Sequence, residues 1–552
     1  MDSAQPEATP YDVVIVGGGI CGAAAALALT QGGYRILLLE QADFASGSTA
    51  ASTRLVQGGL QHLESVQARR LHESLHARER LLRSRSHLVR PQPFLLPVYR
   101  DDGRTPAFVR AGLALYDLLT PRKVGPWSRG FPARAVRRME PSLATDGLRA
   151  TYRIHDGVVD LPERLCLEYL REAREGGADL RNYTSVDFIL GSDGGSRAGG
   201  VDYHDVLSGQ RHTAHARLVL NAAGPWVDDV LQTTGRAMRP RLRSIQGTHV
   251  VLDLAGRGPT HGLLARRGQG QSPVVVVPWL GMHIVGVAES IPPRTGTQQT
   301  QPSSHEIDGL LDAADRLLPG VGMNRSHAVY AYSGLQPWGD PAEPGSRSGR
   351  VIDHGQDGMP GLLSIVGGTL TNAAATADRA VKAVRASIGG APRRSGPRAL
   401  PPRAPANVSF LPPETMAHLR GRYGPRSPEV ASYAGLDAAL AEPISPYHPD
   451  IGAQVVYALE HEQARTVGDV LLRRTPVGRT GDLGRLAADR VAGIMQERLG
   501  WSQAERAQAV RDYDLELHRT LTVLRDWDGR PVRDGASADE SSAEAATDER
   551  PA

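Results

Sequence analysis

The sequence predicts an α/β dinucleotide-binding domain with a Rossmann-like βαβ unit, an α+β antiparallel-sheet substrate domain and an all-α C-terminal domain. Three observations support this architecture. A strand, a glycine turn, a helix and a second strand follow one another within the first forty residues. Several short strand-like segments further along are joined by turns that contain glycine or proline. A run of helical patterns then extends from 413 to 526.

Length and composition fit a multidomain protein. The chain has 552 residues, of which 40% are hydrophobic, enough for two or three domains with cores of their own. Its 63 basic and 60 acidic side chains nearly balance, so we expect no nucleic-acid-binding face. The two cysteines exclude a disulfide scaffold, and no cluster has the spacing of metal ligands, so no metal is expected.

The chain shows no segment that would carry it into or across a membrane. Its most apolar stretch, at 274–288, is too short for a span and contains a proline and a histidine. The first ten residues lack the basic and apolar regions of a signal peptide. We expect a cytoplasmic protein, and peripheral contact with the inner face of the membrane stays open.

The βαβ unit comes first in the chain. Residues 12–16 (DVVIV) predict a buried strand, 19–31 a helix of small residues, and 35–40 (RILLLE) a second strand. Farther on, 66–86 predicts a long amphipathic helix with arginine on its exposed face.

The turn between strand and helix carries a G-x-G-x-x-G motif. Gly17 allows the tight turn, Gly19 lets the backbone approach a pyrophosphate, and Gly22 lets the helix pack closely on its strand. Glu40 ends the second strand 23 residues after Gly17, where an acid can accept a hydrogen bond from a ribose hydroxyl. Together these features predict a dinucleotide site.

A second glycine-rich element favours FAD over NAD as the cofactor. Residues 365–384 predict a strand, a turn at Gly367-Gly368 and an alanine-rich helix. The positive end of that helix is suited to stabilise negative charge that develops near N1 and C2 of a reduced flavin. A nicotinamide carries no such charge.

We expect the two N-terminal domains to alternate along the chain. The strand-like segments at 150–154, 217–221, 248–253, 273–278 and 283–288 suggest an antiparallel sheet between the parts of the nucleotide domain. The expected boundaries are FAD-binding domain 1–90, 151–235 and 341–390; substrate domain 91–150 and 236–340; Pro/Arg-rich linker 391–406; helical C-terminal domain 407–526; disordered acidic tail 527–552. A helix at 487–500 is expected to stop at its glycine.

Seven motifs carry a resemblance to a known family. They are DVVIVGGGICGAAAA from 12, STAASTRLVQGGLQHLE at 48–64, NAAGPWVDDV at 221–230, QGTHVVL at 246–252, VVVPWLGMHIVG at 275–286, YAYSGLQPW at 330–338 and IVGGTLT at 365–371. Through them the chain resembles the FAD-dependent glycerol-3-phosphate dehydrogenases, which are glutathione-reductase-like flavoproteins of the D-amino-acid-oxidase type. The likeness extends from about residue 11 to 526.

The resemblance implies a set of FAD contacts. These are Gly17, Gly19, Gly22, Glu40, Ser48, Thr49, Ser52, Ala223-Gly224, Gly368, Thr369, Leu370 and Thr371.

The positions that the resemblance assigns to the substrate differ from the family pattern. The pattern K-L-I/V-H-G-G-L-R-Y-L corresponds to Arg54–Leu63, so its arginine and tyrosine are Gln61 and His62. The arginine of the family's S-G-V-R-P motif is Gln336 here, and the lysine of G-G-K-L-T is Thr369. Arg350 alone keeps a cationic place.

This loss of cations implies a changed substrate. A phosphate dianion in a partly buried pocket needs charge-assisted hydrogen bonds, each of which contributes about 1.5–3 kcal/mol. We therefore expect a substrate that is neutral or carries one negative charge, which Arg350 would pair. The alternative is that other arginines, such as Arg243 or Arg347, replace the lost cations.

Three residues are candidates for the chemistry. The resemblance places His249 where a general base would remove a hydroxyl proton while hydride leaves the carbon for flavin N5; the alternative is a structural histidine. His62 is a second candidate, since an imidazole there replaces the hydrogen bond of a tyrosine. Tyr332 is either a pocket wall or a half-buried strand aromatic, and the latter is favoured. His155 and Asp156 are interpreted as a pair on a turn.

The leading functional hypothesis is an FAD-dependent dehydrogenase or oxidase acting on a C–OH carbon. Its substrate would be a polyol, cyclitol, sugar-like molecule or hydroxy acid, with a quinone, a carrier or oxygen as electron acceptor. The alternatives are oxidation of a C–N bond in an amine or amino acid, a genuine glycerol-3-phosphate dehydrogenase with a rearranged phosphate site, and a flavin-binding protein without turnover. A homodimer also stays open.

Overall fold

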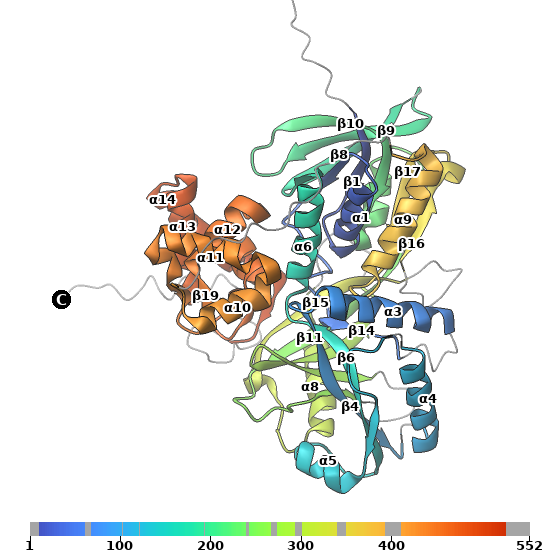
Figure 1. The fold of residues 1–552 in the computed structure, drawn as a ribbon, viewed down its shortest axis with the longest axis vertical. Coiled ribbons are helices and arrows are strands. Elements are labelled where there is room, and N and C mark those ends of the chain that lie inside the picture. Colours follow the sequence, from blue (N-terminus) through green and yellow to red (C-terminus); the bar gives the residue numbers. More distant parts are fainter. Residues whose placement is uncertain are drawn as a thin grey trace, which may run out of the picture.

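The structure, a computed structural model, has three parts that meet around the middle of the molecule (Figure 1). It describes residues 10–60, 68–101, 103–120, 122–192, 194–238, 242–265, 273–292, 301–338, 349–391 and 410–525. The acidic tail expected at 527–552 lies outside these residues, as do Gln61, His62, Arg347 and, apart from Ala391, the linker expected at 391–406.

Within the described residues, one sheet of eight strands carries the predicted βαβ unit. Its order is β16-β17-β10-β1-β2-β7, with β9 paired to β10 and β8 to β9. The strands are β1 (Tyr11–Val16), β2 (Ile36–Leu39), β7 (Asp179–Arg181), β8 (Thr184–Ser192), β9 (Arg197–Asp205), β10 (Arg211–Asn221), β16 (Arg350–Asp353) and β17 (Leu362–Val366). β1 pairs in parallel with both β2 and β10. The predicted strands at 12–16 and 35–40 are thus confirmed.

Both faces of β1 are buried, which explains its unbroken apolar sequence. Val13 and Ile15 face the helical side of the sheet, while Val14 and Val16 pack in a second cluster on the other side. The same reasoning corrects one expectation. The segment 217–221 lies in β10 and pairs in parallel with β1, rather than in the antiparallel sheet, because its LVLN run is buried on both faces.

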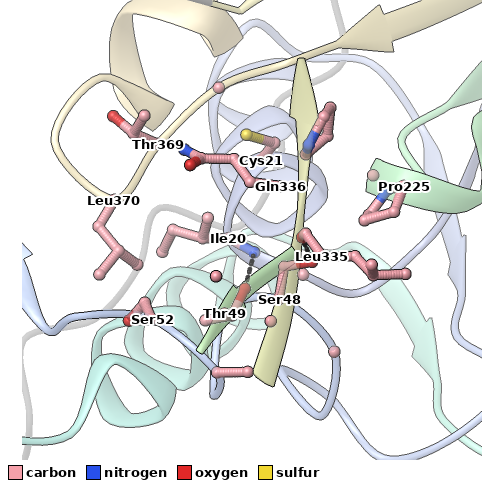
Figure 2. A pocket seen from close by; sticks show the side chains of 18 of the residues that line it. Ile20, Cys21, Ser48, Thr49, Ser52, Pro225, Leu335, Gln336, Thr369 and Leu370 are labelled. Atoms are coloured by element: carbon pink, nitrogen blue, oxygen red, sulfur yellow. Dashed lines mark hydrogen bonds between the residues drawn. The ribbon is translucent and has the colours of Figure 1, made fainter. Parts of the chain in front are cut away.

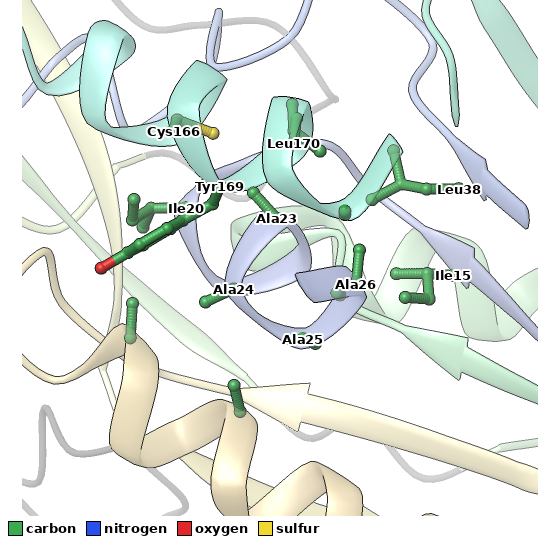
Figure 3. Packing of buried hydrophobic residues seen from close by; sticks show 14 of the residues in the cluster. Ile15, Ile20, Ala23, Ala24, Ala25, Ala26, Leu38, Cys166, Tyr169 and Leu170 are labelled. Carbon is green, nitrogen blue, oxygen red and sulfur yellow. The ribbon is translucent and has the colours of Figure 1, made fainter. Parts of the chain in front are cut away.

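Three helices pack together on one face of this sheet. Helix α1 (Ile20–Gln31) lies between α6 (Pro162–Glu175) and α9 (Ala373–Ile388) (Figure 3). The four alanines at 23–26 are buried, and their small side chains let both neighbouring helices approach closely. The predicted helix at 19–31 and the strand–turn–helix at 365–384 are confirmed.

A second sheet, of ten strands in the described part of the chain, lies below the first in Figure 1. Its order is β20-β15-β11-β14-β13-β12-β4-β6-β3, with β5 paired to β6. The strands are β3 (Leu55–Val56), β4 (Val89–Tyr99), β5 (Arg129–Phe131), β6 (Leu148–Val159), β11 (Arg243–Leu252), β12 (Gly262–Ala265), β13 (Val274–Trp279), β14 (Met282–Ser290), β15 (Ala328–Trp338) and β20 (Thr522–Val523). All pairs are antiparallel except β4 with β12. Since β6 continues to Val159, the boundary expected at 150 falls inside a strand of this sheet.

Helices flank this second sheet. They are α3 (Ala68–Ser84), α4 (Pro106–Leu118), α5 (Ala133–Met139) and α8 (Ser304–Leu317). The helix predicted at 66–86 is therefore confirmed as α3. Among the described residues, no helix is long and apolar enough to pass through a membrane.

The C-terminal domain is mainly helical and lies beside α6 (Figure 1). Its helices are α10 (Pro413–Tyr423), α11 (Ser427–Leu436), α12 (Gly452–Glu462), the π-helical turn η6 (Asp469–Arg474), α13 (Arg485–Leu499) and α14 (Gln503–Thr520). α13 ends at Gly500, whose φ of 73° is left-handed, as predicted. The domain is not purely helical, because β18 (Pro443–Ser445) and β19 (His448–Ile451) form a hairpin and β20 joins the edge of the second sheet.

Candidate functional site

A cavity of about 1150 Å³ lies where the two sheets and the C-terminal domain meet. Its wall is formed by the turn after β1, the segment 46–60, strands of the second sheet, the turn before α9, and three residues of the C-terminal domain. Figure 2 shows part of this wall, with side chains from all of the first four groups directed around one space.

The glycine turn has the geometry that close contact with a dinucleotide requires. Gly17 has a φ of +111°, and a Cβ atom there would lie 2.6 Å from the carbonyl oxygen of Ala222. A Cβ atom on Gly22 would lie 2.0 Å from the oxygen of Gly17, so only glycine lets α1 sit this near the turn. Gly19 is the N-cap of α1, has no side chain to cover the helix end, and lines the cavity. The positive end of α1 thus faces the space where a pyrophosphate would bind.

Glu40 ties the end of β2 to this turn. Its Oε2 accepts a hydrogen bond from the Gly18 amide at 2.6 Å, and its Oε1 accepts one from the Ala42 amide at 3.0 Å. Burial raises the pKa of Glu40, and the amide hydrogen bonds oppose that effect. The side chain lines the cavity, where its oxygens can still accept from a ribose hydroxyl.

The three predicted hydroxyl residues hold the loop after Glu40 in place. Thr49 Oγ1 accepts a hydrogen bond from the Ile20 amide at 3.0 Å, and Ser48 Oγ donates to the Leu335 carbonyl at 2.6 Å (Figure 2). Ser52 Oγ accepts one from the Arg54 amide at 3.3 Å. All three line the cavity, so one loop connects the start of α1 to β15.

The turn before α9 forms the opposite wall. Gly368 has a φ of +102°, and a Cβ atom there would lie 2.5 Å from Cys21 Sγ. The Thr369 amide donates to Asn372 Oδ1 at 2.8 Å, and the Asn372 amide donates to Thr369 Oγ1 at 3.4 Å. Thr369, Leu370 and Thr371 all line the cavity. The positive end of α9 therefore faces the cavity, as expected for stabilising charge on a reduced flavin.

His249 lies on the cavity wall, in β11, directly opposite Tyr332 of β15. The two rings stack with centroids 4.9 Å apart, and His249 Nε2 lies 2.8 Å from Thr53 Oγ1. The Tyr332 hydroxyl donates a hydrogen bond to the Ser52 carbonyl at 2.9 Å. Tyr332 is not among the described lining residues, so its ring packs on the side of His249 that faces away from the cavity. Burial, with help from the Arg54 guanidinium, lowers the pKa of His249 to about 3, so its imidazole is neutral at physiological pH.

Two of the three arginines on the described wall are occupied by acids. Arg54 is fully buried and pairs with Glu163 at 3.4 Å. Arg473 pairs with Asp469 at 2.6 Å and with Asp43. The third, Arg104, is half-buried on the wall.

Acids outnumber these arginines on the described wall. The acidic lining residues are Glu40, Asp156, Asp229, Glu289 and Glu516. Gln336 and Thr369, which stand where the family pattern has cations, line the cavity as neutral side chains.

Arg350 does not belong to the described wall. It begins β16, where it pairs with Val366 on the edge of the first sheet. The described wall therefore gives no support to the predicted contact between Arg350 and the substrate, which stays a prediction. His62 and Gln61 lie outside the described residues, and so does the side chain of Arg243.

Sequence reasoning missed Asp156 and Arg104. Asp156 lies in β6 rather than on a turn, and its Oδ1 accepts hydrogen bonds from the Gly58 amide and from Arg78 Nη1, each at 3.0 Å. Burial raises its pKa, and the charge of Arg78 opposes that effect. Asp156 reaches the cavity because β6 pairs with β3 in a register that sets Gly157 opposite Val56. No local sequence motif predicts that pairing.

Comparisons with known proteins agree with this geometry. The family described as FAD dependent oxidoreductase matches residues 12–381, and the C-terminal domain of alpha-glycerophosphate oxidase matches 364–506. A glycerol-3-phosphate dehydrogenase of Synechocystis sp. is 31% identical over 537 residues, which cover 92% of this chain and 96% of that protein. Glycerol-3-phosphate dehydrogenase 1 of Mycobacterium tuberculosis is 32% identical over 496 residues, 85% of this chain and 91% of that protein.

Solved structures show the same fold. The glycerol-3-phosphate dehydrogenase from Bacillus halodurans complexed with FAD superposes with a TM-score of 0.73 at 23% identity, covering 93% of this chain and 95% of that one. The L-alpha-glycerophosphate oxidase from Mycoplasma pneumoniae with FAD bound gives a TM-score of 0.53 at 17% identity, covering 71% and 100%.

We predict that Gly22→Ala weakens FAD binding by on the order of tenfold or more, because overpacking of this kind costs about 1–3 kcal/mol. The new methyl group would force α1 away from the glycine turn. The dissociation constant is measured by flavin fluorescence on reconstitution of the full chain. Gly421→Ala, at a helical glycine whose Cβ meets nothing within 4 Å, is the control and should bind FAD normally. Equal affinity in both variants would contradict the assignment of the turn.

The low pKa of His249 predicts a pH-dependent stability. The pKa of His249 is about 3 in the folded protein against an ordinary value of 6.5, so below pH 6.5 the unfolded chain binds a proton that the folded chain does not. The stability that this neutral imidazole contributes is present above pH 6.5 and falls as the pH drops toward 3. Between pH 6.5 and pH 5 this residue should lower the free energy of unfolding of the parent by about 2 kcal/mol. His249→Gln should not show this part of the decrease.

The measurement is the melting temperature of parent and variant at the two pH values. His215→Gln, at an exposed histidine, is the control and should show the parent's pH dependence. A variant at His249 that loses stability on acidification as steeply as the parent would disprove the neutral buried state.

Proposed function

The chain belongs to the FAD-dependent oxidoreductase family that includes the glycerol-3-phosphate dehydrogenases, and we propose that it dehydrogenates a hydroxyl-bearing carbon of a small polyol-like substrate other than glycerol 3-phosphate. The family fixes the cofactor as FAD and the reaction class as oxidation–reduction. The substrate and the roles of individual residues are the content of the proposal.

The charge of the cavity wall carries this proposal. A phosphate dianion requires several charge-assisted donors, whereas two of the three arginines on the described wall, Arg54 and Arg473, are already held by acids. Gln336 and Thr369 offer amide and hydroxyl groups, which suit uncharged hydroxyls. The balance therefore favours a substrate recognised through hydroxyl groups.

Asp156 is the acid best placed to select such a substrate. Its carboxylate is held by Gly58 and Arg78, so it keeps one orientation at the wall. A carboxylate accepts hydrogen bonds from substrate hydroxyls and repels a phosphate. We assign it the role of fixing a hydroxyl next to the reacting carbon.

His249 is the proposed proton acceptor. Its imidazole is neutral and reaches the cavity, and Thr53, which also lines the cavity, lies within hydrogen-bond distance of Nε2. The substrate hydroxyl donates to Nε2 directly or through the Thr53 hydroxyl, and its proton transfers as hydride leaves the carbon, when that proton becomes acidic enough for a weakly basic imidazole to accept it. Stacking on Tyr332 holds the ring, and burial excludes water from the acceptor. When bound, FAD would accept the two electrons of the oxidation, and a quinone, a carrier or oxygen would then reoxidise the reduced flavin.

Two observations favour a second function. Arg104 lies on the same wall, and the Synechocystis relative that matches along 96% of its length is named a glycerol-3-phosphate dehydrogenase. Arg104 would then take part in a rearranged phosphate site. Oxidation of a C–N bond, and a protein that binds flavin without turnover, are further outcomes of the test below.

Anaerobic reduction of the bound flavin separates these functions. We predict that uncharged polyols bleach its visible absorbance and that glycerol 3-phosphate at millimolar concentration does so at least a hundredfold more slowly. Gln61→Arg, Gln336→Arg and Thr369→Lys combined should raise the rate with glycerol 3-phosphate, since each charge-assisted bond contributes about 1.5–3 kcal/mol. Rapid bleaching of the parent by sub-millimolar glycerol 3-phosphate, with loss in Arg104→Gln, would establish the second function. Reduction by amino acids alone, or by no donor, would reject both.

Asp156→Asn is predicted to raise the KM for a polyol about tenfold with a smaller change in kcat, because it removes a hydrogen bond to a charged acceptor. Steady-state kinetics on the FAD-loaded enzyme give the two parameters. Asp202→Asn is the control, at an acid of β9 that lies outside the described cavity wall and accepts an exposed hydrogen bond from Thr213. An unchanged KM in Asp156→Asn would remove this residue from the substrate site.

A further inference from the structure

The loop that lines the cavity contains a buried carboxylate that does not itself reach the cavity. Asp43 follows Glu40 by three residues and precedes Ser48 and Thr49, and it is 1% exposed. Its Oδ1 accepts a hydrogen bond from Asn182 Nδ2 at 3.0 Å. An isolated ionised carboxylate at this depth would be strongly unfavourable, so its partners decide whether the loop keeps its conformation.

Those partners come from the C-terminal domain, about 430 residues away along the chain. Arg474 Nη2 donates to Asp43 Oδ1 at 2.9 Å, while Arg474 Nη1 and Arg473 Nε both donate to Oδ2. Both arginines lie in the π-helical turn η6 and are buried. Three guanidinium donors therefore converge on one carboxylate.

The two arginines are in turn held by their own domain. Arg473 Nη2 donates to Asp469 Oδ1 at 2.6 Å, and its Nη1 donates to Glu516 Oε1 of α14 at 2.7 Å. Arg474 Nη2 also donates to the carbonyl of Glu462 at 2.6 Å. The cluster thus joins η6, α12 and α14 to a single loop of the nucleotide domain. We call Asp43, Asp469, Arg473, Arg474 and Glu516 the Asp43 cluster.

Two members of the Asp43 cluster also line the cavity directly. Arg473 and Glu516 line it, together with Thr520 at the end of α14. The loop that Asp43 anchors supplies Ser48, Thr49 and Ser52 to the same wall. The C-terminal domain consequently meets the cavity directly and holds one of its walls through Asp43.

We infer that the C-terminal helical domain positions the FAD-binding loop through the Asp43 cluster, so that retention of FAD depends on Arg473 and Arg474. These arginines act as positioning residues. A buried ion pair adds little net stability compared with apolar packing, but removal of one partner leaves an uncompensated charge and releases the geometry that the pair imposed. Loss of either arginine or of Asp43 therefore frees the loop between Glu40 and Ser52.

The same two domains share a second buried ion pair that provides a matched control. Arg164 Nη1 of α6 donates to Glu462 Oε1 and Oε2 of α12, at 2.6 and 2.7 Å. Both side chains are buried, and neither is among the described lining residues. Arg164→Gln removes this contact between the domains, and it leaves in place both the Asp43 carboxylate with its guanidinium donors and the Glu462 carbonyl that accepts from Arg474.

The experiment uses the full-length chain with Asp43→Asn, which keeps the side-chain shape and removes its charge. FAD is stripped and titrated back, and its dissociation constant and release rate are followed by flavin fluorescence. We expect the dissociation constant to rise at least tenfold and the visible absorption spectrum of bound flavin to shift toward that of free flavin. Arg164→Gln should lower the melting temperature of the protein while FAD affinity changes less than threefold.

Conservative variants keep the inference testable if Asp43→Asn does not fold. Arg473→Lys and Arg474→Lys retain the positive charge but lose the forked geometry, and each should weaken FAD binding by an intermediate factor. Normal FAD affinity in the folded variants of the Asp43 cluster would overturn the inference. An equal loss of affinity in Arg164→Gln would also overturn it, because the effect would then follow from domain contact alone.

Discussion

The close approach of α1 to the turn after β1 is the constraint on which the rest of the site depends. Gly22 lies so near the oxygen of Gly17 that no side chain fits between them, and Gly17 in turn contacts the backbone of Ala222 at the end of β10. This contact fixes the ends of two parallel strands and one helix around a single point. The hydroxyl loop bonds to the start of α1 through Thr49 and to β15 of the second sheet through Ser48, and Gly368 of the α9 turn lies close to Cys21 of α1.

Arginine gives the molecule its long-range connections. The chain has only two lysines among its 63 basic residues, and its buried cations are arginines paired with acids: Arg54 with Glu163, Arg78 with Asp156, Arg164 with Glu462, and Arg473 and Arg474 with Asp43. A forked guanidinium satisfies several acceptors in a fixed geometry, which a lysine cannot do. Each of these pairs joins segments far apart in the sequence. Their charges are compensated by acids, and two of them, Arg54 and Arg473, are arginines of the described cavity wall.

Local patterns in the sequence were sufficient for the elements that touch the nucleotide. The run DVVIV, the glycine spacing and Gly367-Gly368 each specify a conformation within a few residues, and the structure has these elements where they were predicted. Long-range pairing was beyond such patterns. The residues around 217–221 do not predict that β10 pairs with β1. The residues around Asp156 likewise do not predict that the pairing of β6 with β3 places this side chain at the cavity. The resemblance likewise suggested Arg350, but the position of β16 on the sheet edge depends on its pairing with β17.

Thr369 shows how the neutral positions became part of the fold. Its hydroxyl accepts a hydrogen bond from the Asn372 amide, and its own amide donates to the Asn372 side chain, so the pair closes the turn that leads into α9. A lysine at position 369 has no side-chain acceptor for the Asn372 amide, so this hydrogen bond of the turn would be lost. The threonine therefore stabilises the turn that leads into α9 at the cavity wall. Because Thr369 makes these hydrogen bonds, Thr369→Lys would change the stability of the turn before α9 as well as the affinity for substrate.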